Sequence, residues 1–444
     1  MTVKTRIPPS PTGRFHIGTA RTALFNYLFA RQNGGKVVFR SEDTDRARSK
    51  KEFEDEIIEG LHWLGIDWDE FSRQSERGAR YREALETAIA GGHAYVSREP
   101  AKDDPSREVE VVRLKNPGRE VVFEDLVRGP INTHTGDLAD FVIARSLDDA
   151  LYHFAVVVDD FDAGITHVIR GEDHISNTAR QILIQEAIGA PRPAYAHLPL
   201  ILDAKRAKLS KRNGTAVSVG DYRDEGILPE GLVNYLALLG WNPGDEREYF
   251  ALPELVEAFS LEGVQKSGAA WDREKLLSVN QHWMRALSDE DFVRRGGLSA
   301  PDEARLAQAV PLLKERARTF GEARQMLEGE LSCLFAAPTP ARETLLAKEP
   351  KEGPGLAKTA LESLQKAING LPEGVSPEAA KEAVMPLADA EEAKQKGGRG
   401  AVLWPLRYAL SGQERSPDPF TLISILGPKE SEIRIKNALA ILAG

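Results

Sequence analysis

An alternation of strand-like and helix-like segments over the first 76 residues constrains the fold most. Residues 2–7 predict a short strand, and the proline-rich loop at 8–13 cannot continue it as regular structure. Apolar residues at helical spacing then predict a helix that begins near His16 or Ile17 and ends at the glycines after Asn33. A buried strand at 36–40 and a second amphipathic helix follow. This order and spacing predict an α/β fold, a Rossmann-like doubly wound parallel sheet.

The pattern changes between about residues 95 and 151, where short β-rich runs alternate with proline and glycine turns. We interpret this stretch as an α+β domain inserted into the sheet domain. The α/β pattern returns with a strand at 165–170, a helix at 177–188 that Ser176, Asn177 or Thr178 would cap, and an apolar strand at 196–202. From about residue 221 onward the spacing predicts mostly helices.

Size and composition exclude some classes of protein. At roughly 100–200 residues per domain, 444 residues suit two to four domains. Since no run of about 18 apolar residues is present, we expect no membrane partner and a cytoplasmic protein. The one cysteine, Cys333, cannot form an intramolecular disulfide or a cysteine-based zinc site, and we interpret it as a packing residue. A net charge of −10 says little about RNA, which needs only a local basic face.

Two segments could bind phosphate. The first is His16-Ile17-Gly18-Thr19, where a helix begins after the proline-rich loop, so that backbone N–H groups and the positive helix end face one crevice. An ordinary capped helix start explains this segment equally well. The second is Lys208-Leu209-Ser210-Lys211-Arg212, whose cations could hold a transferring phosphate, although a solvated basic turn is the alternative.

Two charged segments directly follow predicted strands, where the residues of an open α/β sheet line the ligand crevice. Glu42 begins the first, and a carboxylate there could pair with a substrate ammonium group, or Asp43 or Asp45 could cap a helix. In the second, Arg170 could hold a carboxylate with two parallel hydrogen bonds. His174 invites a metal hypothesis, but without a partner His or Cys at ligand spacing we favour a polar-loop histidine.

The order of these segments resembles the class I aminoacyl-tRNA synthetases, and within them bacterial-type glutamyl-tRNA synthetase. The resemblance rests on RIPPSPTGRFHIGTARTALFNYLFAR, SEDTDRAR, VIRGEDHISNT, AHLPLIL with KLSKRNG, and LPEGLVNYLALLGW, and more weakly on WPLRYALSG. It covers nearly the whole chain and is strong to about residue 285. The family activates glutamate with ATP and Mg²⁺ to glutamyl-adenylate, normally with tRNA bound, and then transfers the glutamyl group to the terminal adenosine of the tRNA.

The resemblance also implies roles for particular residues. Those implied for glutamate are Arg6, Ser10, Glu42, Tyr152 and Arg170, with Arg170 the partner of the side-chain carboxylate. Those implied for ATP are His16, Gly18, Asp173, Lys208, Ser210 and Lys211, of which His16, Lys208 and Lys211 would be catalytic. Lys211 is the lysine expected at the phosphate in the transition state.

The implied domains are a catalytic domain at 1–76 and 157–202, an acceptor-stem-binding insertion at 77–156, a connecting domain at 203–286 and a helical anticodon-binding region at 287–444, with a further split near 370. The chain departs from the family's pattern at Thr19, Ser41 and Val156. The insertion looks short and contains no cysteine, so we predict no structural zinc there and an altered grip on the acceptor end.

Besides a nucleotidylyltransferase of the same fold, against which the KLSKR segment joined to a long helical tail argues, two alternatives stay open at this point. One is a relative that glutamylates a modified tRNA base, against which the long helical tail argues. The other is a non-catalytic tRNA-binding paralogue, against which the intact KLSKR segment and Arg170 argue. The sequence predicts a monomer that acts on tRNA(Glu), on tRNA(Gln), or on both, and does not decide among these acceptors.

Overall fold

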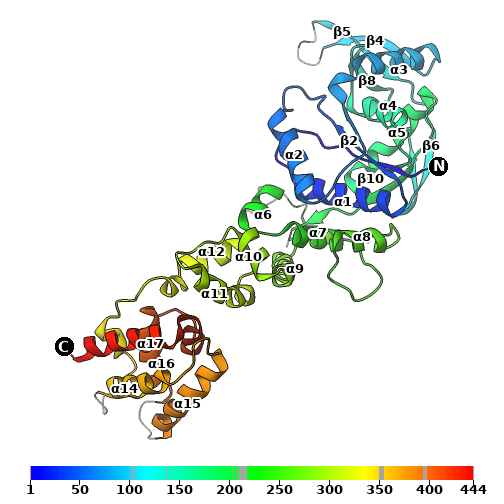
Figure 1. The fold of residues 1–444 in the computed structure, drawn as a ribbon. Helices are drawn as coiled ribbons and strands as arrows, with labels where there is room; N and C mark the ends of the chain where they lie inside the picture. Colours follow the sequence, from blue (N-terminus) through cyan, green and yellow to red (C-terminus); the bar gives the residue numbers. More distant parts are fainter. Residues whose placement is uncertain are drawn as a thin grey trace. The chain divides into compact units, whose positions relative to one another are not determined.

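The computed structural model describes residues 2–101, 104, 106–136, 138–203, 205–207, 209, 218–349, 355–393 and 398–443. The chain divides into two compact units, Met1–Asn280 and Gln281–Gly444. Figure 1 shows strands and helices mixed in the first unit and helices alone in the second. Among the described helices, none is long and apolar enough to cross a membrane.

Parallel strands form the centre of the first unit. Their bounds are β1 (Lys4–Ile7), β2 (Lys36–Ser41), β3 (Glu70–Arg73), β10 (His167–Gly171) and β11 (Ala194–Leu198). β1, β2 and β3 are parallel neighbours, as are β10 and β11, and the N–H of Thr166 donates to the oxygen of Lys4 at 3.0 Å where β1 and β10 adjoin. Helix α1 (Ile17–Gln32) packs on β1, β2 and β10. The predicted parallel-sheet fold is confirmed, and the carboxyl ends of β1, β2 and β10 share one edge.

Most of the inserted segment forms an antiparallel sheet, but one hairpin joins the parallel strands. The elements are α3 (Gly78–Ala90), β4 (Ala94–Pro100), β5 (Glu108–Leu114), β6 (Glu120–Asp125), β7 (Gly129–His134), β8 (Phe141–Ser146) and β9 (Asp149–Ala150). The order β4-β5-β8-β9 makes one sheet, whereas β6 and β7 extend the other in the order β10-β11-β6-β7. Val112, Phe123 and Phe154 belong to one buried cluster that joins both sheets. The insertion therefore shares a core with the parallel sheet.

Helices cover the strands and lead to the second unit. They are α2 (Lys51–Trp63), α4 (Tyr152–Asp162), α5 (Ile175–Ile188), α6 (Val219–Glu225), α7 (Pro229–Leu238), α8 (Leu252–Ala258) and α9 (Arg273–Ala286), with short strands β12 (Ile201–Leu202) and β13 (Ala269–Ala270). The predicted strand 196–202 is two strands, because Pro199 has no N–H to donate and the chain then pairs with β13 instead.

The predicted cap of the helix after β10 is wrong. Helix α5 begins at Ile175 and its N-cap residue is His174, which makes no capping hydrogen bond with its side chain. The hydroxyl of Thr178 instead accepts a hydrogen bond from the guanidinium of Arg170 at 2.7 Å. The buried guanidinium of Arg170 forms a stronger hydrogen bond with the Thr178 oxygen than a backbone N–H would. This oxygen is therefore not used as the helix cap.

The second unit is helical in its described part. Its helices are α10 (Asp289–Gly296), α11 (Glu303–Arg316), α12 (Phe320–Glu328), α13 (Arg342–Leu345), α14 (Leu356–Asn369), α15 (Pro377–Ala393), α16 (Gly400–Ser411) and α17 (Pro419–Ala443). The last helix is interrupted at Gly427, whose φ of 76° allows a kink ahead of Pro428. Further along the same helix, Arg434 is buried and donates to the carbonyl oxygens of Cys333 and Leu410. The prediction that the C-terminal region is helical is confirmed for its described residues.

Candidate active site

The start of helix α1 presents donors to a cavity. His16 is the N-cap residue, and its Nδ1 accepts the N–H of Gly18 at 2.9 Å. A Cβ on Gly18 would lie 3.2 Å from that nitrogen, so glycine lets the turn close tightly. The capped-start interpretation is therefore confirmed, because the imidazole caps the helix, and the anion-site interpretation stays a prediction.

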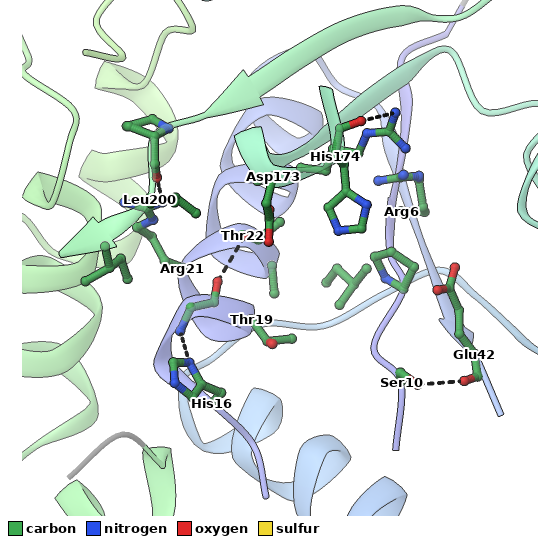
Figure 2. Close-up of a pocket in the computed structure, with 18 of the residues that line it drawn as sticks. Arg6, Ser10, His16, Thr19, Arg21, Thr22, Glu42, Asp173, His174 and Leu200 are labelled. Carbon is green, nitrogen blue, oxygen red and sulfur yellow. Dashed lines mark hydrogen bonds between the residues drawn. The ribbon is translucent and has the colours of Figure 1, made fainter. Parts of the chain in front are cut away.

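The cavity has a volume of about 420 Å³ and opens at the shared edge of β1, β2 and β10. All eight described residues of the predicted site line it: Arg6, Ser10, His16, Gly18, Glu42, Tyr152, Arg170 and Asp173. In Figure 2, Arg6, Ser10 and Glu42 lie on one side, and His16 lies on the other. Lys208, Ser210 and Lys211 lie outside the described residues, whereas Leu209 between them lines the cavity.

Buried charges stand at the Arg6 side of the cavity. Arg40 donates to Glu42 at 2.9 Å and to Asp160 at 2.5 Å, and Arg6 Nε lies 3.5 Å from the same Asp160 oxygen. Burial raises the pKa of Glu42, against the opposing charge of Arg40. Ser10 donates its hydroxyl hydrogen to the backbone oxygen of Glu42 at 3.0 Å. These contacts hold the carboxylate of Glu42 and the guanidinium of Arg6 at the same side of the cavity. Such a pair suits an amino acid, which has an ammonium group and a carboxylate group of its own.

Asp43 and Asp45, the alternative caps, do not cap helix α2. The helix begins at Lys51, its N-cap residue Lys50 makes no capping hydrogen bond with its side chain, and Asp43 accepts from the N–H and hydroxyl of Ser75 instead.

Arg170 is held by protein acceptors on several sides. Its Nη1 donates to Gln181 at 2.7 Å, its Nη2 donates to Thr178 at 2.7 Å, and its Nε donates to Nε2 of His197 at 3.2 Å. Only 5% of the residue is exposed, and this burial lowers the pKa of Arg170. Because the guanidinium is already fixed, it loses little further conformational entropy when a carboxylate binds to it.

His174 lines the same cavity as an uncharged residue. Burial, with the nearby charge of Arg170, lowers its pKa to about 4. Its Nδ1 lies 3.2 Å from the amide nitrogen of Asn177. Across the described residues, no group of three His, Cys, Asp or Glu side chains could hold a metal ion, and the metal hypothesis for His174 gains no support.

Sequence reasoning missed several residues of the site. Arg21 is buried in helix α1 and lines the cavity, where it donates to the oxygens of Pro199 and Leu239, and burial lowers its pKa to about 10. Arg40 and Asp160 were also missed, because an arginine inside an apolar strand and an aspartate inside a helix give no local signal. The ion pair between them joins positions 120 residues apart, which spacing does not reveal.

Gly171 provides a test of Asp173. A Cβ at Gly171 would lie 2.6 Å from Oδ1 of Asp173, too close for both to stay in place. If Asp173 binds ATP, as the family resemblance implies, we expect Gly171→Ala to turn the carboxylate away and to raise the KM for ATP about three- to tenfold, as for one disturbed polar contact. The KM for glutamate should not change. Steady-state kinetics measure both, and Gly400→Ala, whose added Cβ meets nothing within 4 Å, is the control. An unchanged KM for ATP would remove Asp173 from the nucleotide site.

Comparison with known families agrees with this geometry. Residues 2–104 and 97–278 match the model of the catalytic domain of class I tRNA synthetases (E and Q). Residues 275–439 match the model of an anticodon binding domain. The fold and the site therefore define a class I aminoacyl-tRNA synthetase.

The most similar relatives narrow this class. The glutamate–tRNA ligase of Aquifex aeolicus (strain VF5) is 41% identical over 483 aligned residues, and that of Anaeromyxobacter sp. (strain Fw109-5) is 40% identical over 487, each covering 99% of both chains. A solved glutamate tRNA ligase from Elizabethkingia meningosepticum, in complex with its amino acid, has a TM-score of 0.86 at 30% identity over the whole of both chains. A glutamate-tRNA synthetase from Elizabethkingia anophelis has a TM-score of 0.82 at the same identity, covering 99% of this chain and 100% of its own.

This chain belongs to the glutamate–tRNA ligase family. The family, the α/β fold class and the ATP-dependent ligase activity predicted from the sequence are confirmed.

Proposed function

We propose that the cavity at the start of helix α1 is where this enzyme activates L-glutamate. Glutamate attacks the α-phosphate of ATP to give glutamyl-adenylate and pyrophosphate. The 2′-hydroxyl of the terminal adenosine of tRNA then attacks the carbonyl carbon of the adenylate, loses its proton and takes the glutamyl group, with release of AMP. The observation that carries the proposal is that eight residues, predicted from four segments of the chain and from the family resemblance, all line one cavity. The protein contributes positioning and charge stabilisation to an in-line displacement at phosphorus.

The glutamate half of the cavity is the side that holds Arg6, Ser10, Glu42, Tyr152 and Arg170. In the proposal, Glu42 pairs with the α-ammonium group, and the two arginines face the carboxylates of the substrate. Burial raises the pKa of Tyr152, so its hydroxyl stays protonated and can donate a hydrogen bond. The pairing of each cation with one carboxylate gives selectivity for a dicarboxylic amino acid.

The ATP half is the side that holds His16, Gly18 and Asp173, with Lys208, Ser210 and Lys211 assigned to it from the sequence. The N–H groups at the start of α1 would face the triphosphate. The substrate in this proposal is the magnesium complex of ATP, because Mg²⁺ usually binds proteins through substrate phosphates and keeps several waters.

A second cavity suggests where the acceptor enters. It has a volume of about 790 Å³ and shares Ser10, Glu42 and Tyr152 with the first. Arg46 and Arg145 line it, from the segment after β2 and from the inserted domain. We propose that the 3′ end of the tRNA enters here, because the 2′-hydroxyl must reach the carbonyl carbon of the adenylate and this cavity adjoins the first one.

The helical region at 287–444 would bind the anticodon, and the insertion at 77–156 would bind the acceptor stem without a structural zinc. We propose tRNA(Glu) as the acceptor and a cytoplasmic monomer as the active form. Aminoacylation assays with purified tRNA(Glu) and tRNA(Gln) decide whether the enzyme also, or instead, charges tRNA(Gln).

Exchange of pyrophosphate into ATP tests the activation step. We expect glutamate-dependent exchange when tRNA is present, and assays without tRNA show whether activation needs it. Glutamine and aspartate serve as control amino acids and should support no exchange. Absence of exchange with glutamate, with tRNA and without it, would overturn the proposed function.

A further inference from the structure

Asp125, a residue of the insertion, contacts the amino-acid side of the cavity indirectly, through His197 and Arg170. Strand β6 lies beside β11, with Asp125 opposite Tyr195, and β11 lies beside β10, with His197 opposite Arg170. Asp125, His197 and Arg170 thus come from three neighbouring strands of one sheet. Asp125 and His197 are 1% and 0% exposed and do not line the cavity themselves.

The three side chains form a chain of hydrogen bonds. Nδ1 of His197 lies 2.5 Å from Oδ2 of Asp125, and Nε2 of His197 accepts from Nε of Arg170 at 3.2 Å. Oδ1 of Asp125 also accepts the backbone N–H groups of Val127 at 3.0 Å and Arg128 at 2.9 Å. Donors therefore surround both oxygens of the carboxylate, which stabilises its ionised form.

These contacts fix the tautomer of His197. A carboxylate at 2.5 Å requires a proton on Nδ1, and the N–H of Arg170 requires a lone pair on Nε2. Burial disfavours the charge of Asp125, but the hydrogen bonds from His197 and the backbone N–H of Arg128 hold its pKa below the usual value. Burial, against the opposing influence of Asp125, lowers the pKa of His197, which keeps the imidazole neutral.

We propose that Asp125 and His197 are positioning residues for glutamate recognition, which act by holding the guanidinium of Arg170 in place. Asp125 selects the tautomer of His197, and Nε2 of that tautomer anchors Nε of Arg170. With the other tautomer, the N–H of Nε2 would face the N–H of Arg170 Nε and could donate to the hydroxyl of Thr178, which also lies 3.2 Å from Nε2. The guanidinium would then keep Gln181 but lose the acceptor of its Nε and compete for Thr178, so it would no longer be fixed in its position at the cavity. This inference rests on the proposed role of Arg170 in binding the substrate carboxylate.

Asp125→Asn tests the pair with almost no change in volume. The amide oxygen can still accept the backbone N–H groups, but the amide N–H₂ would face Nδ1 of His197 and move its proton to Nε2. We expect the KM for glutamate to rise roughly 10- to 100-fold, as for a disturbed charged hydrogen bond, with kcat and the KM for ATP changed less than threefold. Titration calorimetry should show the same loss of glutamate affinity without catalysis.

Asp140→Asn is the matched control. Asp140 also lies in the insertion and accepts from the backbone N–H of Asn116 at 2.8 Å and from the hydroxyl of Tyr95 at 3.0 Å, with no link to Arg170. It should leave the KM for glutamate unchanged. A merely structural Asp125 would instead lower the melting temperature and kcat while sparing the KM for glutamate, and that result would overturn the inference.

His197→Ala compared with His197→Gln tests the proposal even if Asp125→Asn does not fold. Alanine removes the acceptor of Arg170 Nε and should raise the KM for glutamate roughly tenfold, and an unchanged KM in His197→Ala would overturn the inference. The amide oxygen of glutamine can accept from Arg170 without any help from a carboxylate, so the KM for glutamate should stay within about threefold of the wild-type value. Adding Asp125→Asn in this background should then raise it no further, because neighbouring residues in one network are not additive. A full additional rise would overturn the inference. Wild-type enzyme with no glutamate-dependent exchange would instead refute the proposed function, so the two failures are distinguishable.

Discussion

Replacing Lys211 by alanine is expected to lower the rate of glutamate-dependent pyrophosphate exchange about 100- to 1000-fold, the loss typical of one transition-state charge contact. Lys211 belongs to the KLSKR segment, and Leu209 of the same segment lines the cavity. Negative charge on the phosphate grows in the transition state. The ammonium group of Lys211 should therefore stabilise the transition state more than the bound substrates. The KM for glutamate should change less than threefold, since the lysine is assigned to the nucleotide side.

The control for this variant is Lys205→Ala. Lys205 is exposed, precedes the same segment and lies in the turn where its backbone N–H donates to Asp203. Its removal should leave the exchange rate unchanged. Pre-steady-state exchange and equilibrium binding of glutamate measure the two quantities separately. Equal losses of rate and of glutamate affinity in Lys211→Ala would contradict the assigned role.

Replacing Arg170 by alanine should chiefly raise the KM for glutamate, by roughly 10- to 150-fold, as for the loss of a charged hydrogen bond. The variant also leaves Gln181, Thr178 and His197 without their common donor, so its free energy of unfolding should fall by about 1–3 kcal/mol. Arg170→Lys keeps the charge but not the planar geometry and should recover little of the affinity.

The melting temperature and the kinetics of Arg170→Ala must be compared with a surface arginine. Arg192→Ala removes a half-exposed partner of Glu186 from the same unit and should leave the KM for glutamate unchanged. Unchanged glutamate kinetics in Arg170→Ala would reject it as the carboxylate partner. A fall in stability alone would leave the guanidinium with a structural role only.

The sequence predicts the elements of this fold well because its periodicity is strong where the sheet is buried. Its strand ends indicated Glu42 and Arg170, which line the cavity, because residues just after parallel strands face the ligand edge in this architecture, whereas the resemblance supplied Asp173. His16 and Gly18 were found because a helix start has a local signature. The resemblance to a family supplied Ser10 and Tyr152, which have no such signature.

Other features depend on contacts between distant segments. The sequence around Asp160 does not indicate that Arg40 binds it, because 120 positions separate the two residues. The hydrogen bond of Thr178 to Arg170 replaced an expected helix cap, because a tertiary contact overrode a local preference. The place of β6 in the parallel sheet was also unforeseen, since spacing shows that a strand exists but not which neighbour it joins.

The hairpin β6–β7 limits how this enzyme can be recombined with its relatives. An insertion is often treated as an exchangeable module, but here its second hairpin, β6–β7, is part of the parallel sheet. A chimaera that exchanges residues 77–156 as a block would replace Asp125 and with it the support of the amino-acid pocket. A chimaera that keeps β6 and β7 and exchanges only the strands of the other sheet, β4, β5, β8 and β9, should preserve the affinity for glutamate. It would still change the surface of the insertion that faces the tRNA.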